Sequence, residues 1–221
     1  MIDIQQQEEM LIAIGEKIEK KISVYAIGGT AMMFRSIKNS TFDVDFVFEK
    51  KRDREYFIST LKKLGAKEID RRLVYGLQKD TPTVLDFENC RFDLFMEKII
   101  TSRFSEKMKK RAGQIHEFGN LIIKAADYHD VLIMKSVTSR AKDLEDIINI
   151  INKKSINWEI ILDEAKEQVA LGNEHAILSL GEKLEKLNNQ KAIKVPKEVL
   201  DELWKLLEKQ WPNLILVKVL I

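Results

Sequence analysis

Residues 42–49, Phe-Asp-Val-Asp-Phe-Val-Phe-Glu, restrict the fold of this chain more than any other segment. Every second residue from Phe42 to Phe48 is apolar, which is the period of a β-strand. Asp43 and Asp45 occupy positions between them, so both carboxylates lie on one face. The apolar neighbours indicate a central, buried strand, where carboxylates are costly unless a cation or a hydrogen-bond donor compensates them. The segment therefore predicts a sheet with a functional acidic pair.

The pattern up to residue 126 alternates between strands and helices. We expect helices at 3–21, 31–37, 53–64 and 103–111, strands at 24–27, 42–49, 67–78 and 119–127, and a hairpin at 84–96 that turns at Glu88-Asn89. Thr30 is expected to cap the second helix, and Gly65 to end the third. This part predicts a mixed β-sheet with flanking helices.

The pattern after residue 126 is helical almost to the end. Helices are expected at 128–139, 141–153, 157–171, 173–188 and 197–210, separated by short polar breaks. We therefore predict an α+β chain with an α/β core at 1–126 and a helical bundle at 127–221. The apolar segment 213–221 is expected to form a final strand, a core plug or an oligomer contact.

Composition excludes several classes of protein. Lys and Arg number 37 and Asp and Glu number 35, a balance that argues against a polybasic protein held to nucleic acid by bulk charge. The single cysteine, Cys90, excludes an internal disulfide and a multi-cysteine zinc site. The polar N-terminus predicts no signal peptide, and no apolar run reaches membrane-spanning length. We expect a cytoplasmic protein without membrane contact.

The Gly28-Gly29-Thr30 turn joins a predicted strand to a predicted helix. Glycines allow a phosphate to approach the backbone closely, and a helix N-terminus offers free N–H groups. Thr30 adds a hydroxyl. These residues are candidates for nucleotide binding, although Gly-Gly turns also occur for conformational reasons alone.

Asp93, in Phe92-Asp93-Leu94, is a third acidic residue in an apolar strand. If its strand neighbours the first, three carboxylates converge as in sites that hold two metal ions for phosphoryl transfer. Hard oxygen ligands suit Mg²⁺, and Mn²⁺ is an alternative. Asp86 has the same local pattern, so the sequence leaves Asp86 and Asp93 open as the third carboxylate. We favour Asp93 because its strand is longer and more apolar.

These motifs together resemble the nucleotidyltransferase superfamily, the fold of DNA polymerase beta and the CCA-adding enzymes. A Gly-Gly pair, thirteen further residues, an apolar-flanked Asp-x-Asp and a later apolar-Asp-apolar follow one another over residues 22–96. The resemblance is closest to the minimal prokaryotic branch that includes AbiEii-like toxins, as judged from the segments YAIGGTAMMF, STFDVDFVF and RFDLF. The resemblance implies catalytic and metal-binding roles for Asp43, Asp45 and Asp93.

The segment LIMKSVTSRAKDLEDI, residues 132–147, resembles the helical motif that follows the core in the AbiEii-like branch. The resemblance implies that Lys135 contacts nucleotide phosphates and that Arg140 and Asp143 complete or brace the pocket. A snorkelling Lys135 and a solvated, salt-bridged helix start at 140–146 are the alternatives that the residues themselves leave open.

The resemblance implies a metal-dependent enzyme that transfers a nucleoside monophosphate from an NTP to an acceptor hydroxyl. RNA, such as a tRNA end, is a candidate acceptor for a toxin-like action. The alternative is a non-catalytic nucleotide-binding or partner-binding protein on the same fold. An antitoxin-like protein and a second copy of the chain are candidate partners.

The densest basic stretch is Lys107-Met108-Lys109-Lys110-Arg111, preceded by Arg103. Such a stretch is most often a solvated helix face, and the alternative is a surface that steers RNA. The three histidines are scattered, and the tryptophans at 158, 204 and 211 are expected in the core or at an interface.

Overall fold

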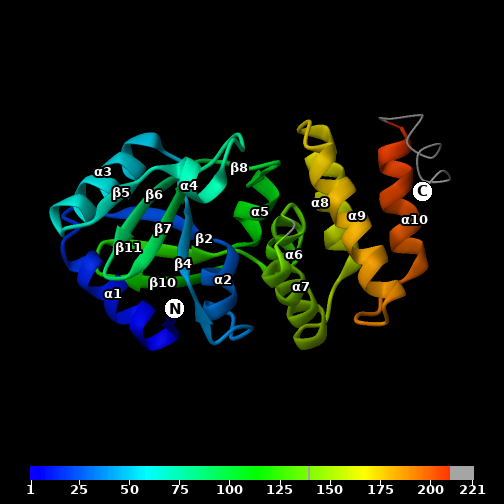
Figure 1. Cartoon of the computed structure of the whole chain (residues 1–221), viewed down its shortest axis with the longest axis horizontal. Helices are drawn as coiled ribbons and strands as arrows, with labels where there is room; N and C mark the ends of the chain where they lie inside the picture. The colour runs from blue at the N-terminus through cyan, green and yellow to red at the C-terminus, as the bar shows by residue number, and fades with distance from the viewer. Residues whose placement is uncertain (139, 210–221) are drawn as a thin grey trace.

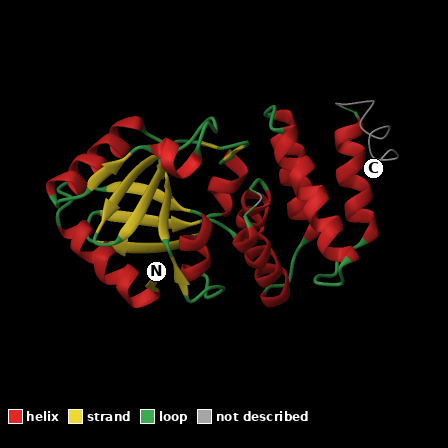
Figure 2. Cartoon of the chain, in the orientation of Figure 1, coloured by secondary structure: helices red, strands yellow, loops and turns green. Residues whose placement is uncertain are grey.

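The structure, a computed structural model, describes residues 1–138 and 140–209. A mixed β-sheet with its helices lies at one end of the elongated molecule, and a group of helices lies at the other (Figures 1 and 2). This arrangement confirms the predicted α+β fold class. The apolar segment 213–221 and Trp211 lie outside the described residues.

The sheet-containing part runs from the N-terminus to residue 125. Its elements are β1 Ile2–Asp3, α1 Ile4–Glu16, β2 Ile22–Ala26, α2 Gly28–Phe34, β3 Ser40–Thr41, β4 Asp43–Val47, α3 Lys51–Lys63, β5 Lys67–Ile69, α4 Arg71–Tyr75, β6 Thr83–Phe87, β7 Cys90–Phe95, β8 Lys98–Ile99, β9 Ser102–Arg103, α5 Glu106–Arg111, β10 Gln114–Phe118 and β11 Leu121–Ala125. The main sheet has the order β10-β11-β2-β4-β7-β6-β5. The pairs β11–β2 and β4–β7 are parallel, and the other neighbours are antiparallel.

The two faces of the sheet pack against different layers. Val44 and Phe46 of β4 point to one face, where they join a buried cluster with α1 and α3. The other face meets α2, α5 and α6, and its cluster continues into the helices beyond. Asp43 and Asp45 alternate with Val44 and Phe46, so their carboxylates lie on this second face. The sheet thus places the acidic pair where it faces the helical part.

Local sequence explains several element boundaries. Asp3 caps α1 in a capping box, in which its side chain accepts from the Gln6 backbone and the Gln6 side chain accepts in return. Glu88 and Asn89 both have positive φ, 50° and 62°, as a tight turn between β6 and β7 requires. Gly65 follows Leu64, the C-cap residue of α3, with φ of 103°. The hairpin turn and the glycine stop are confirmed.

Other local predictions were wrong. Thr30 does not cap a helix: α2 begins at Gly28, two residues earlier, with Ile27 as its N-cap. The strand expected at 67–78 ends at Ile69, and α4 follows it. Strand β10 was not predicted, because its residues 114–118 lack a regular apolar alternation. Phe42, expected in the buried strand, precedes β4 and is 62% exposed.

The helical part contains α6 Tyr128–Ser136, α7 Ala141–Lys153, α8 Trp158–Ala170, α9 Glu174–Asn189 and α10 Lys197–Glu208 within the described residues. These helices confirm the five predicted segments, with α6 and α10 ending earlier than expected. The boundary predicted after residue 126 falls between β11 and α6. One buried cluster crosses it, since Tyr25 and Phe104 pack with residues of α6 to α10. The division into two domains stays a prediction. In residues 1–138 and 140–209, no helix has the length and apolar character to cross a bilayer.

Candidate active site

Three carboxylates converge on the sheet face that meets α6. Asp43 and Asp45 lie on β4, and Asp93 lies on the neighbouring parallel strand β7. The register pairs Asp45 with Asp93, so the two side chains stand beside each other on the same face. One carboxylate oxygen of each of the three aspartates lies within 4.8 Å of the other two. The structure therefore brings together the three acids that the sequence singled out.

Asp86, the alternative third acid, lies elsewhere. It is on β6, one strand further from β4, and its side chain is exposed. The register places it opposite Arg91 rather than opposite Asp45. The acidic cluster of the described residues therefore contains Asp93 and not Asp86.

Arg91, which the sequence analysis did not single out, bridges two of the three acids. Its Nη2 donates to Asp43 Oδ2 and, at 2.7 Å, to Asp93 Oδ2, while its Nε donates to Asp93 Oδ1 at 3.0 Å. The bridge follows from register, because Arg91 lies two residues before Asp93 and opposite Asp43 on the same sheet face. The two-residue spacing before Asp93 was the signal in the sequence that could have revealed this arginine.

Tyr75 holds the other side of Asp93. Its hydroxyl donates to Asp93 Oδ2 at 2.6 Å. The pKa of the phenol is raised, mainly by burial and secondly by the negative charge of Asp93. Burial also raises the pKa of Asp93, against the opposing effects of Arg91 and Tyr75. Tyr75 was not predicted as a site residue because residues 67–78 were interpreted as one strand, whereas the structure places Tyr75 at the end of α4.

Asp45 is the carboxylate with the least compensation. Burial, and then repulsion from Asp43 and Asp93, raise its pKa well above the usual range. Two like charges at this separation favour a cation between them. The donor set consists of hard carboxylate oxygens, which are the ligands that divalent cations such as Mg²⁺ prefer. The residues therefore fit a divalent cation at this cluster.

The two glycines of the Gly28-Gly29-Thr30 turn make room for this cluster. Gly28 has φ of 55°, and a Cβ at this position would lie 2.4 Å from Asp45 Oδ2. A Cβ on Gly29 would lie 2.4 Å from the Thr41 hydroxyl, which in turn donates to Asp43 Oδ1 at 3.2 Å. Both glycines thus allow α2 to approach the acidic strand closely.

Thr30 ties α2 to the acidic strand. Its buried hydroxyl accepts from the backbone N–H of Asp45 at 3.0 Å and lies 3.4 Å from the carbonyl oxygen of Asp43, to which it donates. These bonds fix the backbone on both sides of Val44. The position explains why a hydroxyl residue follows the glycines, since an aliphatic side chain would leave both groups without a partner.

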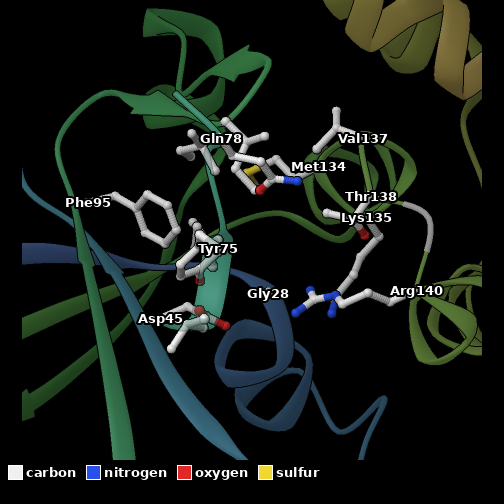
Figure 3. Close-up of a pocket in the computed structure, with 14 residues that line it drawn as sticks. Gly28, Asp45, Tyr75, Gln78, Phe95, Met134, Lys135, Val137, Thr138 and Arg140 are labelled. Carbon is white, nitrogen blue, oxygen red and sulfur yellow. The ribbon is translucent and has the colours of Figure 1, made fainter. Parts of the chain in front are cut away.

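A cavity of about 230 Å³ opens beside Asp45, between the sheet and α6 (Figure 3). Its wall contains both polar and apolar residues. The polar lining consists of Gly28, Asp45, Tyr75, Gln78, Lys135, Thr138 and Arg140, and the apolar lining of Ile27, Val74, Phe95, Ile99, Ile100, Met134 and Val137. Such a combination suits a ligand with a charged end and a flat apolar end.

Lys135, Arg140 and Asp143 form one ion-pair network at the edge of this cavity. Lys135 Nζ lies 2.8 Å from Asp143 Oδ1 and 2.8 Å from Asp146 Oδ2. Arg140 Nε donates to Asp143 Oδ2 at 2.7 Å. Lys135 is buried, and although burial disfavours its charge, Asp143 and Asp146 raise its pKa. Asp143 therefore holds both cations at the cavity, where Figure 3 shows them pointing toward Asp45.

The basic stretch on α5 is largely neutralised by acids of the same chain. Lys107 Nζ lies 2.9 Å from Asp163, and Lys109 Nζ lies 2.9 Å from Glu97. Arg111 pairs with Asp130 and Glu164. This arrangement favours the interpretation of α5 as a packed helix with ion pairs over that of an RNA-steering surface.

The remaining candidates are structural. His129 Nδ1 lies 2.6 Å from Asp127 Oδ1, and its Nε2 accepts from the backbone of Asn157. His116 stacks on Phe34. Cys90 is buried at the start of β7, and burial raises the pKa of its thiol to about 12, which makes a nucleophilic thiolate unfavourable.

A mixed sheet with three converging carboxylates beside a partly apolar cavity defines an enzyme of the nucleotidyltransferase class. Residues 2–190 match the family described as "Nucleotidyltransferase of unknown function (DUF6036)", and the chain belongs to that family. This match confirms the predicted superfamily and the prediction that the protein is an enzyme.

Two solved structures resemble the chain at low sequence identity. One is ANT(2″)-Ia in complex with adenylyl-2″-tobramycin, with 12% identity and a TM-score of 0.46, covering 81% of this chain and 98% of that one. The other is an antigenic nucleotidyltransferase-like protein from Paracoccidioides brasiliensis, with 14% identity and a TM-score of 0.49, covering 90% of this chain and 98% of that one. No curated protein matches the chain.

Proposed function

We propose that this protein transfers a nucleoside monophosphate from an NTP to an acceptor hydroxyl in a reaction that depends on a divalent metal. The observation that carries the proposal is the convergence of Asp43, Asp45 and Asp93 beside the cavity. Carboxylates at this separation are a recurrent arrangement for phosphoryl transfer, because they place cations next to the reacting phosphate.

Asp43 and Asp45 are the metal ligands in this proposal, and Asp93 completes the site. Two Mg²⁺ ions are expected, with Mn²⁺ as a substitute. When bound, the metal neutralises charge on the triphosphate and lowers the pKa of the acceptor hydroxyl. Asp93, fixed by Arg91 and Tyr75, accepts the proton of the acceptor.

In this proposal, the parts of the nucleotide are assigned to different residues of the cavity lining. The triphosphate lies at the polar end, near Asp45 and Arg140, and the base lies against the apolar wall formed by Val74, Ile100 and Met134. Gly28 and Gly29 allow a phosphate to approach the backbone, whereas Thr30 braces the strand. Arg140 is the more accessible cation. Lys135 also lines the cavity and stabilises the negative charge of the phosphates, and Asp143 pairs with both Lys135 and Arg140.

The candidate acceptor is an RNA hydroxyl, such as that of a tRNA end. RNA, a toxin-like action and an antitoxin-like partner are supported by the resemblance of the motifs to AbiEii-like toxins. The ion pairs on α5 give an RNA acceptor no further support. The suggested homo-oligomer contact rests on the segment 213–221, outside the described residues.

The test is incubation of the protein with each α-labelled NTP, Mg²⁺ and total RNA, followed by gel analysis and measurement of pyrophosphate. The wild type is expected to label the acceptor and to release pyrophosphate. The Asp43→Ala/Asp45→Ala variant is expected to do neither while keeping its melting temperature. Equal pyrophosphate release by the variant and the wild type would refute the site.

One observation favours the non-catalytic alternative. Both oxygens of Asp93 already accept hydrogen bonds, from Arg91 and Tyr75, so the third carboxylate is occupied by the protein itself. The alternative predicts saturable, metal-dependent nucleotide binding with no pyrophosphate released from any acceptor. Thermal shift with NTP and Mg²⁺, measured beside the pyrophosphate assay, separates the two functions.

A further inference from the structure

We propose that Tyr75 is itself an acceptor, so that the protein nucleotidylates its own Tyr75 hydroxyl. This inference rests on the proposed function, because it uses the same NTP and the same acidic cluster. It adds a covalent modification site and assigns one acceptor class, a phenolic hydroxyl of the chain.

The first observation is the contact between a nucleophile and a base. Tyr75 Oη donates to Asp93 Oδ2 at 2.6 Å. A hydroxyl within hydrogen-bond reach of a base that is itself oriented by a third group is the usual arrangement of an activated nucleophile. Arg91 is that third group, since its Nε and Nη2 both donate to Asp93. The Tyr75 hydroxyl thus occupies the place that an incoming acceptor hydroxyl requires.

The second observation is the position of Tyr75 in the cavity wall. Its side chain lines the cavity together with Asp45, Gly28 and Arg140 (Figure 3). Thr138 is the other hydroxyl residue of the described lining, and its hydroxyl donates to Asp143 instead. Tyr75 is therefore the lining residue that combines a hydroxyl with a contact to the acidic cluster.

The third observation is the loose attachment of the segment that carries Tyr75. Helix α4 is five residues long and buries none of them completely, and Leu73 is 83% exposed. Gly76 follows directly with φ of 61°. The Tyr75 ring meets the core through an edge contact with Phe95, at 6.4 Å between ring centroids. Small shifts of α4 can therefore adjust the hydroxyl without disturbing the sheet.

The proposed step is a substitution at phosphorus. Tyr75 Oη attacks the α-phosphorus of the NTP, and a phenolic O–P bond forms. The bond between the α-phosphorus and the oxygen that bridges it to the β-phosphorus breaks, and pyrophosphate leaves. The phenolic proton passes to Asp93 Oδ2, which later loses it to solvent. Nothing is oxidised or reduced, and the product is a tyrosyl nucleoside monophosphate.

The experiment uses the full chain with Mg²⁺ and each of the four NTPs, without another acceptor. Intact mass spectrometry is expected to show a gain of one nucleoside monophosphate, and peptide mapping is expected to place it on Tyr75. Tyr75→Phe, which keeps the ring and removes the hydroxyl, should carry no adduct. The matched control is Tyr128→Phe, since the Tyr128 hydroxyl donates to the Ser155 carbonyl at the surface and lies outside the site. This control should be modified like the wild type.

Nucleotide binding and labelling of RNA are measured on the same samples. An adduct that maps elsewhere, or that persists in Tyr75→Phe, would overturn the proposal. RNA labelling or metal-dependent NTP binding by a wild type that stays unmodified would overturn self-nucleotidylation alone. A wild type that neither binds NTP nor releases pyrophosphate would overturn the proposed function as well. Melting temperatures of all variants show that they are folded.

Discussion

Two acidic clusters of this protein each gather carboxylates around one arginine. In the site cluster of Asp43, Asp45 and Asp93, Arg91 pairs with Asp43 and Asp93. In the second cluster, between α5, α6 and α8, Asp130 and Glu164 share Arg111.

The second cluster is closed. Arg111 Nε lies 3.1 Å from both oxygens of Asp130, and its Nη2 donates to Asp130 and Glu164. Gln168 donates to the remaining oxygen of Glu164 at 2.9 Å. The site cluster instead has three carboxylates to one arginine, which pairs with Asp43 and Asp93, and Asp45 lines a cavity. The difference suggests that a closed cluster stabilises packing, whereas an open one keeps a place for a cation.

Replacement of Asp45 should have the largest effect on activity and little effect on stability. Asp45→Asn removes a carboxylate that would hold the metal, so pyrophosphate release should fall about a thousand-fold. The melting temperature should stay the same or rise, because repulsion from Asp43 and Asp93 is relieved. Mg²⁺ should raise the melting temperature of the wild type more than that of the variant.

Asp86→Asn is the matched control for this change, since Asp86 is exposed on the neighbouring β6. It should keep full activity. If Asp45→Asn retained activity within about tenfold of the wild type, the open cluster would have no catalytic role, and the contrast between the clusters would fail.

Replacement of Arg111 should have the opposite pattern. Arg111→Met leaves two buried carboxylates without a counter-ion, which should lower the free energy of unfolding by about 3–5 kcal/mol. Urea unfolding measures this loss. Adding Asp130→Asn and Glu164→Gln to the same chain removes both stranded charges and should recover part of it. A stable single variant would show that the second cluster is not a closed structural unit.

The second cluster should also make stability depend on pH. Burial raises the pKa of Asp130 to about 7, against the opposing effect of Arg111, while Glu164 and Asp127 raise it further. The unfolded chain has a pKa of about 3.9 at this residue. At pH values between these two pKa values, Asp130 is therefore protonated in the folded protein and ionised in the unfolded chain. This contribution to stability is present at low pH and is lost as pH rises through about 7.

Asp130→Asn cannot titrate at this position, so it serves as the comparison. From about pH 5 to about pH 7, the wild type should lose about 2 kcal/mol of stability relative to the variant. Urea unfolding at several pH values gives both curves. Parallel curves would mean that Asp130 stays ionised throughout this range.

The sequence allowed much of the site cluster to be predicted, and the limits of that prediction are physical. The alternation in residues 42–49 gave β4 and the shared face of Asp43 and Asp45, because period two is a local property. The order of motifs then led to Asp93. The choice between Asp86 and Asp93 needed the strand pairing, which depends on contacts distant in sequence.

The parts that were missed depend on tertiary contacts. Tyr75 lies on a five-residue helix whose sequence, RRLVY, is equally suited to a strand. The acids of other segments that neutralise α5 come from four parts of the chain, so the basic stretch looked unpaired in the sequence. Arg91 is the exception. Its two-residue spacing from Asp93 can be read from the sequence, although its contact with Asp43 can be seen only in the structure.

Glycine substitutions test how closely the open cluster is packed. Gly28→Ala places a methyl group 2.4 Å from Asp45 Oδ2 at a positive φ. It should reduce activity about tenfold or more because Asp45 must move, and it should cost about 1–2 kcal/mol of stability. Gly172→Ala has a similar φ of 75° but no atom within 4 Å of the added Cβ. It should show the stability cost alone. Equal activity losses in both variants would mean that backbone strain, and not Asp45, is responsible.

The smallest effect is expected for Lys107 on α5, at the surface next to the second cluster. Lys107 Nζ lies 2.9 Å from Asp163, and the side chains of the pair are 37% and 56% exposed. Water screens such a pair, so Lys107→Ala should change the free energy of unfolding by less than about 1 kcal/mol.

The effect of Lys107→Ala on RNA binding should be equally small, because a lysine already paired with a carboxylate releases few counter-ions from a phosphate. Titration of RNA at several salt concentrations measures this directly. A slope of log affinity against log salt that falls by about one on replacement would mean that Lys107 leaves Asp163 to contact a phosphate. In that case α5 would be part of an RNA-binding surface.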